Sequence, residues 1–395
     1  MIFLTGATGF LGREVLRDLV LHERPERIAI LARSARRESA TARVDALLDD
    51  LGLSELLKTK ILPTELHVLE GDLCAERFGL SDYDYSHLVS QTERVIHCAA
   101  STSFSLSSQQ AFEANVLSTE RVLELCRSLN MSQFQRSLMH VSTAYVAGET
   151  QATVSAAELD LTRPFRNTYE QSKAEAEARV RQISGDFHTT IVRPSIVVGN
   201  SQTGATSAFN VIYGPAKLLV RGLYPVLPGR ASTPFDVVPV DYVVRAMLEL
   251  ARRVRPSGQS FHLCAGEGRE STLRELIELL LRAFQGYRRG QGGILHSESL
   301  VIPELVQLAF SSWSMASETL KKIERLLVGK FEALSHILYF LPYLHSNPRF
   351  DVRCVTTELG QVIPLPPLFK DYATQIFDYC FATNWGRRPL AVVTA

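Results

Sequence analysis

Residues 2–21, IFLTGATGFLGREVLRDLVL, place an apolar run, a glycine-rich loop and an amphipathic segment in immediate succession. The run at residues 2–4 predicts a short buried strand. Beyond the loop, apolar residues recur at helical spacing, at Leu11, Val15, Leu16 and Leu19. Gly6, Gly9 and Gly12 therefore form a G-x-x-G-x-x-G pattern between a strand and a helix, the context in which such a pattern predicts dinucleotide binding.

Glycine is expected at each of these three positions for a separate physical reason. Gly6 permits the tight turn, Gly9 lets the backbone approach a pyrophosphate, and Gly12 lets helix and strand pack closely. The N-terminus of the following helix offers N–H groups and a partial positive charge to the phosphates.

Further short apolar runs alternate with helical stretches through the first half of the chain. We expect strands at residues 27–31, 67–69, 95–98, 138–141 and 191–192, and helical segments such as 115–129 between them. This alternation predicts an α/β fold, a doubly wound parallel Rossmann sheet covered by helices on both faces.

Beyond residue 199 the pattern loosens, and a smaller, mainly helical C-terminal substrate region is expected. We assign residues 1–200, with 230–265 returning to them, to the dinucleotide-binding domain, and 201–229 and 266–395 to the substrate region. Thr272 and Glu275 form a capping box that opens a helix with one apolar stripe, made of Leu273, Leu276, Ile277, Leu280, Leu281 and Phe284. GYRRGQGG at 286–293 predicts a linker or exposed loop, and the following chain is helical and apolar to about residue 344.

Composition excludes several classes of function. Lys+Arg and Asp+Glu both number 42, so the chain lacks the basic excess of a general nucleic-acid binder. The six cysteines are scattered and predict reduced thiols, and no metal-ligand spacing occurs among them or among the ten histidines. We expect a cytoplasmic protein, because the N-terminus lacks a signal-peptide pattern and no run reaches the length of a transmembrane span.

The end of the second predicted strand indicates which dinucleotide is bound. An enzyme that uses NAD usually carries Asp or Glu there, on the ribose 2′-hydroxyl, whereas this chain reads ILARSARR and has no acid before Glu38. Arg33 is placed for a 2′-phosphate, with Arg36, Arg37 or Arg43 assisting, so we predict NADPH; the alternative is a solvated basic helix start. After the third strand, Asp72 and Leu73 are candidates for adenine contacts, or else form an ordinary turn.

A Tyr-x-x-x-Lys pair, Tyr169 and Lys173, lies in the helical stretch NTYEQSKAEAEARV. Four residues are about one turn, so both side chains share a face, and the ammonium is expected to lower the pKa of the phenol. Thr143 ends the fifth strand in HVSTAY, where a hydroxyl faces the ligand crevice of a parallel sheet. Ser142 is the alternative hydroxyl, ranked behind Thr143, and His97 and His140 are interpreted as strand residues.

The motifs TGATGFLG, HCAA, NVLST, VSTAY, YEQSK, RPSIVVG and VPVDYVV occur in the order shown by the extended short-chain dehydrogenase/reductases, which the chain resembles over residues 1 to about 265. Within that family it most resembles the fatty acyl-CoA reductases and the thioester reductase (male-sterility-like) group. The likeness lies in the HCAASTSFSLSSQQAFEANVLSTERVLELC segment, in HVSTAY, and in an Arg-bearing insertion at 34–60 that sugar epimerases usually lack.

The resemblance implies roles for residues that match the family's motifs. Thr143 would hydrogen-bond the substrate carbonyl oxygen, Tyr169 would donate the proton, and Lys173 would orient the nicotinamide ribose and lower the pKa of Tyr169. The cofactor-binding positions implied are Thr5, Gly6, Thr8, Gly9, Phe10, Leu11, Gly12, Arg33, Arg43, Asp72, Leu73, Ala99, Ala100, Asn115, Lys173 and Pro194.

The activity implied is NADPH-dependent reduction of an acyl thioester to an aldehyde and on to an alcohol in a second round. The acyl group would arrive on CoA or on an acyl carrier protein, since the chain shows no adenylation or carrier domain. An NAD(P)-dependent sugar epimerase or dehydratase, a hydroxysteroid-type dehydrogenase of the same fold, and a non-enzymatic dinucleotide sensor are the alternatives.

The C-terminal half supports two further interpretations. Lys217 or Arg221 would reach a phosphopantetheine or CoA phosphate, or else is a solvated charge. The apolar stretch at 301–344 would cover an acyl tunnel or make peripheral contact with a membrane, or else belongs to the core. LPYLHSNPRFDVRCVTTELG at 341–360 loosely resembles the C-terminal segment of fatty acyl-CoA reductases and favours a lipid-like substrate.

Overall fold

The computed structural model describes residues 1–35, 38–129, 136–185, 187–209, 211–220, 229–253, 256–290 and 339–387. Its strands are β1 (Ile2–Thr5), β2 (Arg27–Ala32), β3 (Glu65–Glu70), β4 (Arg94–His97), β5 (Ser137–Val141), β6 (Thr153–Val154), β7 (His188–Pro194), β8 (Ile196–Val198), β9 (Pro234–Phe235), β10 (Val237–Pro239), β11 (Gln259–Leu263), β12 (Ser271–Thr272) and β13 (Arg349–Phe350). Its α-helices are α1 (Phe10–Asp18), α2 (Ala40–Asp50), α3 (Ser54–Lys58), α4 (Asp82–Gln91), α5 (Ser108–Ala111), α6 (Ser118–Ser128), α7 (Thr168–Gln182), α8 (Tyr213–Val220), α9 (Val240–Arg252), α10 (Leu273–Gly290), α14 (Leu341–His345), α15 (Arg353–Leu359) and α16 (Phe369–Ala382). Short 3₁₀ or π turns are η1 (Leu19–Glu23), η2 (Glu76–Gly79), η3 (Phe112–Leu117) and η4 (Ala144–Ala147).

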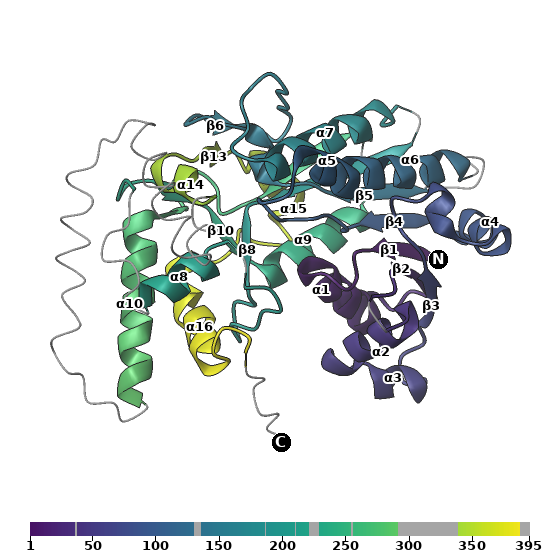
Figure 1. Cartoon of the computed structure of the whole chain (residues 1–395), viewed down its shortest axis with the longest axis horizontal. Helices are drawn as coiled ribbons and strands as arrows, with labels where there is room; N and C mark the ends of the chain where they lie inside the picture. The colour runs from purple at the N-terminus through teal and green to yellow at the C-terminus, as the bar shows by residue number, and fades with distance from the viewer. Residues whose placement is uncertain are drawn as a thin grey trace.

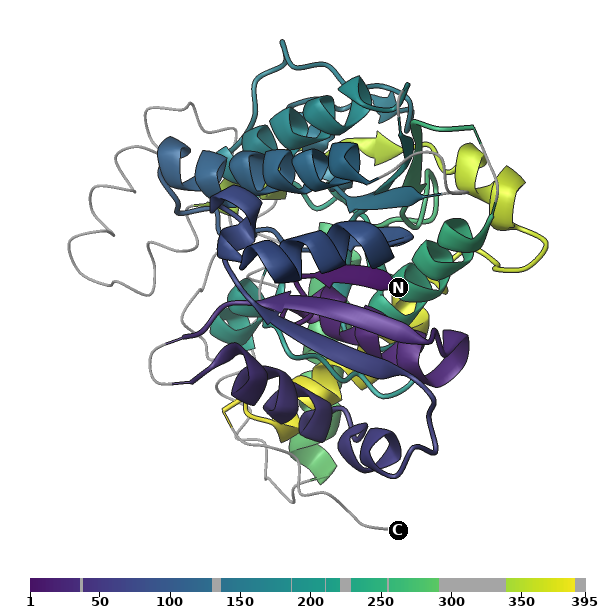
Figure 2. The same ribbon diagram turned by 90° about the vertical axis from the view of Figure 1, so that its right-hand side faces the viewer.

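Among the described residues, the largest sheet has seven strands in the order β11-β7-β5-β4-β1-β2-β3. Every neighbouring pair is parallel, as in the registers Ile2↔Ile28 and Ile2↔Arg94. Helices lie on both faces of this sheet (Figure 2). The doubly wound parallel sheet expected from the sequence is therefore confirmed, and β11 is a strand that the sequence patterns did not single out.

Alternating side chains on each strand fill two separate cores, because successive residues of a strand point to opposite faces. On β1, Ile2 and Leu4 enter the core formed with α1, α2 and α9. Phe3, between them, enters the core formed with α4 and α6. Since both faces are buried, the strands read as continuous apolar runs, which explains why they could be recognised from sequence.

The strand order reverses between β1 and β4, which are neighbours in the sheet. From β1 the chain adds β2 and β3 toward one edge, and from β4 it adds β5, β7 and β11 toward the other. In open α/β sheets, ligands bind at the carboxyl ends of the strands at such a switch point. The glycine loop follows β1 directly, so the fold places it at this position.

Helices α8, α10, α14 and α16 gather at the end of the molecule opposite β3 and α4 (Figure 1). The expected capping box of α10 is present: Glu275 N–H donates to Thr272 Oγ1 at 3.2 Å, and Thr272 N–H donates to Glu275 Oε2 at 2.9 Å. The stripe from Leu273 to Leu281 is buried as predicted.

The linker expected at 286–293 is wrong for its first five residues, because α10 continues to Gly290. Phe284 and Tyr287 pack on the ring of Phe381 in α16, with centroids 5.5 and 5.3 Å away. This packing outweighs the low helix propensity of Gly286. Residues 291–293, and the apolar stretch expected at 301–338, lie outside the described residues.

Within the part of the chain that the structure describes, no helix is both long enough and apolar enough to cross a membrane.

Candidate active site

The glycine loop packs so closely that side chains cannot be added at two of its positions. Gly6 has φ +76°, and a Cβ there would lie 2.6 Å from the backbone nitrogen of Ala99. A Cβ on Gly12 would lie 2.1 Å from the carbonyl oxygen of Gly6. Gly9 donates its N–H to that same oxygen at 2.9 Å, which closes the turn.

The N-terminus of α1 is left open for an anion. Gly9 is the N-cap, no side chain caps the helix, and the first turn contains no acidic residue. Thr8 and Gly9 are exposed at the tip of the loop. Free N–H groups and the helix dipole therefore face outward here, as a pyrophosphate requires, so the residues present fit the dinucleotide that the motif predicts.

Two residues expected at the cofactor, Thr5 at the end of β1 and Asn115 of η3, make structural hydrogen bonds through their side chains. Thr5 is buried and its Oγ1 lies 2.7 Å from His97 Nδ1, with Ala99 N–H donating to the same oxygen at 3.4 Å. Asn115 Oδ1 accepts from Ser101 N at 2.7 Å, and its Nδ2 donates to Ser172 Oγ at 2.9 Å. Asn115 thus ties the segment after β4 to α7.

Arg33 follows β2, and its side chain is exposed. Arg43, from α2, donates to the carbonyl oxygen of Arg33. Burial and Asp72 raise the pKa of Cys74, and the Arg33 guanidinium opposes that rise. Asp72 Oδ1 accepts from Cys74 N at 2.9 Å, an Asx turn. Arg36 and Arg37 lie outside the described residues.

Thr143, Tyr169 and Lys173 come together at the carboxyl end of the sheet. Thr143 lies two residues beyond the end of β5, as the N-cap of η4, and its Oγ1 donates to Pro194 O of β7 at 3.5 Å. Tyr169 and Lys173 both belong to α7, as the sequence predicted, and Asn167 caps that helix by accepting from Glu170 N at 3.0 Å. Lys173 Nζ donates to Val141 O at 2.7 Å.

The expectation that Lys173 lowers the pKa of Tyr169 is wrong for this structure. Burial raises the pKa of Tyr169 to about 12, and the hydrogen-bonding Thr143 side chain opposes that rise. Burial also lowers the pKa of Lys173 to about 8, with Glu177 acting in the opposite direction. With a pKa of about 12, the Tyr169 phenol is protonated at neutral pH.

A buried ion pair lies under these residues. Arg193 donates to both oxygens of Glu177, at 2.9 and 2.7 Å, and Ser142 Oγ donates to Glu177 Oε2 at 2.7 Å. Arg193 holds the pKa of Glu177 below its usual value despite burial. Ser142 is thus bonded to the ion pair, whereas the Thr143 side chain hydrogen-bonds Tyr169.

The two strand histidines are structural. His97 lies between Thr5 and Thr119 Oγ1, the latter 3.2 Å from Nε2, and burial lowers its pKa to about 3. His140 packs beside it with ring centroids 5.4 Å apart, and burial likewise lowers its pKa. The described residues contain no cluster of His, Cys, Asp and Glu side chains that could hold a metal ion.

A cavity of about 440 Å³ joins the glycine loop to Thr143, Tyr169 and Lys173 and continues between the C-terminal helices. Gly6, Gly9, Phe10, Leu11, Ala100 and Pro194 line it at one end, and Thr143, Tyr169 and Lys173 in the middle. The far wall is apolar and consists of Tyr213, Ala216 and Leu219 of α8, Leu273, Leu276, Ile277 and Leu280 of α10, and Tyr343 and Leu344 of α14. The α10 stripe, which the sequence indicated as core, thus also borders the site.

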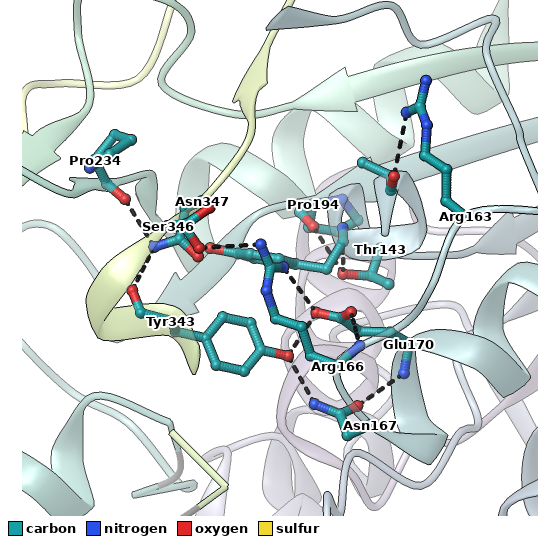
Figure 3. A network of polar contacts seen from close by, with 12 residues as sticks. Thr143, Arg163, Arg166, Asn167, Glu170, Pro194, Pro234, Tyr343, Ser346 and Asn347 are labelled. Carbon is teal, nitrogen blue, oxygen red and sulfur yellow. Dashed lines mark hydrogen bonds and ion pairs between the residues drawn. The ribbon is translucent and has the colours of Figure 1, made fainter. Parts of the chain in front are cut away.

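Sequence patterns missed the polar network that joins α7 to α14 (Figure 3). Tyr343 OH donates to Glu170 Oε1 at 2.5 Å, and Arg166 pairs with the same carboxylate at 3.2 Å. Phe104, which packs against both Tyr169 and Tyr343, was also missed. Single aromatic residues so far apart in the chain carry no periodic signal that could have indicated them.

Lys217 lies on α8, and Arg221 falls outside the described residues.

A parallel sheet with a glycine loop at its switch point and a Thr, Tyr and Lys group at the adjacent strand ends defines an extended short-chain dehydrogenase/reductase with an NAD(P)-binding domain. Residues 4–247 match the family described as "Male sterility protein". The chain belongs to this family, in the group that includes the fatty acyl-CoA reductases.

Three curated relatives illustrate the match. Fatty acyl-CoA reductase wat of Drosophila melanogaster is 25% identical over 280 residues, which cover 63% of this chain and 53% of the relative. Fatty acyl-CoA reductase 2 of Homo sapiens is 30% identical over 280 residues, which cover 62% of this chain and 53% of the relative. The nonribosomal peptide synthetase asaC of Aspergillus flavus is 28% identical over 285 residues, covering 69% and 26%. The chain spans about half the length of the acyl-CoA reductases and a quarter of the synthetase.

Solved structures share the fold at lower identity. The terminal R domain from the myxalamid PKS-NRPS pathway has a TM-score of 0.75 and 23% identity, covering 98% of this chain and 92% of that one. A thiolation-reductase di-domain from an archaeal non-ribosomal peptide synthetase has a TM-score of 0.67 and 17% identity, covering 97% and 75%. MoeE5, in complex with UDP-glucuronic acid and NAD, has a TM-score of 0.60 and 17% identity, covering 98% and 99%.

Proposed function

We propose that this chain is an NADPH-dependent reductase of acyl thioesters, which releases an aldehyde and, after a second round, an alcohol. One observation carries the proposal: a single cavity connects a dinucleotide loop, a Thr–Tyr–Lys group and a long apolar wall. Curated relatives named fatty acyl-CoA reductases support the choice of substrate class.

The glycine loop would hold the pyrophosphate, and Arg33 with Arg43 would hold the 2′-phosphate of NADPH. No acidic residue lies between β2 and Glu38 to bond a free ribose 2′-hydroxyl, and the Arg33 side chain is exposed at that point. Asp72 and Leu73 would border the adenine. Ala99, Ala100 and Pro194 would approach the nicotinamide side, and Lys173 would bond its ribose.

The bound nicotinamide would supply a hydride to the thioester carbonyl carbon. The residues of the chain manage the charge that develops on the carbonyl oxygen. Tyr169, protonated because its pKa is about 12, donates a proton to that oxygen, and the Thr143 hydroxyl donates a hydrogen bond to it. The resulting hemithioacetal loses the thiol to leave the aldehyde.

The apolar wall would accommodate the acyl chain. We propose residues 201–229 and 266–395 as the substrate region, with 1–200 and 230–265 as the dinucleotide-binding domain. The side chains of α8, α10 and α14 that border the cavity offer few polar partners, which suits an acyl group more than a sugar ring. The acyl group would be presented on CoA or on an acyl carrier protein.

Turnover of purified protein with NADPH tests the proposal directly. We expect loss of NADPH absorbance with a long-chain acyl-CoA, together with release of free CoA. A nucleotide sugar and a hydroxysteroid serve as parallel substrates. Turnover with either of them, and none with any acyl thioester, would overturn the proposal in favour of an epimerase or a dehydrogenase of this fold.

Arg33→Ala tests the choice of dinucleotide. Losing a charged contact to the 2′-phosphate should raise the KM for NADPH about 10-fold or more while leaving the KM for NADH nearly unchanged. Arg17→Ala, which removes an exposed arginine from α1 outside the cavity, is the control. Equal effects of Arg33→Ala on both nucleotides would contradict the assignment of Arg33.

A further inference from the structure

Tyr343 reaches the catalytic helix from a distant part of the chain. It lies on α14, is buried, and borders the cavity. Its hydroxyl donates to Glu170 Oε1 at 2.5 Å and accepts from Asn167 Nδ2 at 2.7 Å. Figure 3 shows this contact between Tyr343 and Glu170. Glu170 is the immediate neighbour of Tyr169 in the chain, so the contact ends one residue from the proposed proton donor.

Glu170 in turn organises the start of α7. Its Oε2 accepts from the backbone N–H of Arg166 at 3.0 Å, and its Oε1 accepts from the Arg166 guanidinium at 3.2 Å. Asn167, the second partner of Tyr343, is the N-cap of α7. The Tyr343 hydroxyl therefore bonds two residues that set where the first turn of α7 begins.

The ring of Tyr343 provides a second connection to Tyr169. Phe104 stacks on Tyr343 with centroids 5.6 Å apart, and packs against Tyr169 at 5.7 Å. The Arg166 guanidinium also lies over the ring of Tyr343, 4.9 Å from its centroid. The hydroxyl and the ring of Tyr343 thus contact the surroundings of Tyr169 through different neighbours.

We infer that Tyr343 is a positioning residue of this active site: through Glu170 and Phe104 it holds the phenol of Tyr169 at the reacting carbonyl, so that α14 completes the site. The inference rests on the proposed role of Tyr169 as proton donor. It assigns to the C-terminal segment a part in the rate of reaction as well as in forming the wall of the cavity.

Other contacts anchor α14 without Tyr343. Asn347 Nδ2 donates to Pro234 O at 2.9 Å, and Thr233 Oγ1 donates to Leu344 O at 3.0 Å. The backbone N–H of Arg230 donates to Leu344 O at 2.9 Å. Removing the Tyr343 hydroxyl should therefore leave α14 in place, and the variant Tyr343→Phe tests the hydroxyl alone.

Steady-state kinetics of Tyr343→Phe provide the first measurement. We expect kcat to fall between about 10-fold and 100-fold, as small displacements of a reacting group do, with the dissociation constant for NADPH and the KM for the thioester within about two-fold of wild type. Tyr372→Phe is the matched control, because Tyr372 is also a buried C-terminal tyrosine, donates to Val237 O at 3.3 Å, and does not border the cavity. Its kcat should remain within about two-fold of wild type.

A double variant shows whether Tyr343 acts through Glu170. If it does, Tyr343→Phe combined with Glu170→Gln loses no more kcat than the more severe single variant. Multiplicative losses would contradict that route. Wild-type kcat in Tyr343→Phe, or equal losses in Tyr343→Phe and Tyr372→Phe that follow the folded fraction, would overturn the inference.

Hydrogen–deuterium exchange of the full chain tests the same contact without a substrate. Tyr343→Phe should raise exchange in the peptide that covers 164–173 and leave the peptides of α1 and α6 unchanged, because the hydroxyl bonds only the start of α7. Unchanged exchange at 164–173 would overturn the inference. If wild-type protein reduces no thioester, the proposed function fails, and this exchange measurement still decides whether Tyr343 holds α7.

Discussion

Burial of the Tyr169 phenol raises its pKa to about 12, so the phenol remains protonated. A protonated phenol suits the donation of a proton to a carbonyl oxygen during reduction. The sequence predicted that Tyr169 and Lys173 share one face of a helix, because spacing alone determines that. It could not predict their pKa values, which depend on burial and on neighbours such as Thr143 and Glu177.

Replacing Tyr169 with Phe removes the proposed proton donor and little else. We expect kcat to fall about 100-fold or more, with NADPH affinity nearly unchanged, because general acid catalysis contributes about that much. Tyr242→Phe, at another buried tyrosine that does not border the cavity, is the control and should retain activity. Activity of Tyr169→Phe within a few-fold of wild type would show that another group donates the proton.

Lys173 makes the stability of the unliganded protein depend on pH. Its pKa is lowered to about 8 by burial, from an ordinary 10.5. Below pH 8 the native protein carries a buried ammonium, which opposes folding. Between pH 8 and 10.5 the unfolded chain binds more protons than the native chain, so stability rises with pH.

Lys173→Met should therefore increase the free energy of unfolding at pH 7 by about 1–3 kcal/mol while abolishing activity. The gain over wild type should shrink as the pH rises through 8 toward 10.5, measured by urea unfolding. Lys58→Met, at an exposed lysine, should show no such trend. A Lys173→Met protein less stable than wild type at pH 7 would contradict the assigned effect of burial.

At the scale of elements, β1, the glycine loop and α1 could be predicted because their signals are local: an apolar run, a glycine pattern and helical periodicity. The residue at which α10 ends could not be predicted from such local signals. Gly286 and the Arg and Gly residues beyond it favour a loop, and the contacts of Phe284 and Tyr287 with Phe381 come from a helix about 100 residues further along the chain.

Gly12→Ala and Gly286→Ala should have opposite effects. The added methyl group at Gly12 meets the backbone oxygen of Gly6 at 2.1 Å, so we expect a loss of about 1–3 kcal/mol of stability and much weaker NADPH binding. The methyl group at Gly286 meets nothing within 4 Å, so Ala should stabilise α10 by about 0.5–1 kcal/mol. Thermal unfolding and NADPH titration measure both; a destabilised Gly286→Ala would contradict the helical assignment there.

For the whole molecule, the class of sheet followed from the alternation of strands and helices, because parallel strands buried on both faces read as apolar runs. The pairing of β11 with β7 did not follow, since strand order depends on contacts distant in sequence. The same limit applied to the site. Thr143, Tyr169 and Lys173 lie within 31 residues, whereas Tyr343 joins Glu170 across 173 positions.

Transfer of deuterium from NADPH labelled at the reactive carbon of its nicotinamide to the acyl product is the most direct test of thioester reduction. Purified protein is incubated with labelled NADPH and a long-chain acyl-CoA, and the products are analysed by mass spectrometry. We predict free CoA and an aldehyde that carries deuterium at its carbonyl carbon, or an alcohol that carries two deuterium atoms at that carbon. Tyr169→Phe should form either product about 100-fold more slowly or worse. Consumption of NADPH without any deuterated aldehyde or alcohol, or no consumption with any acyl thioester, would contradict the assignment.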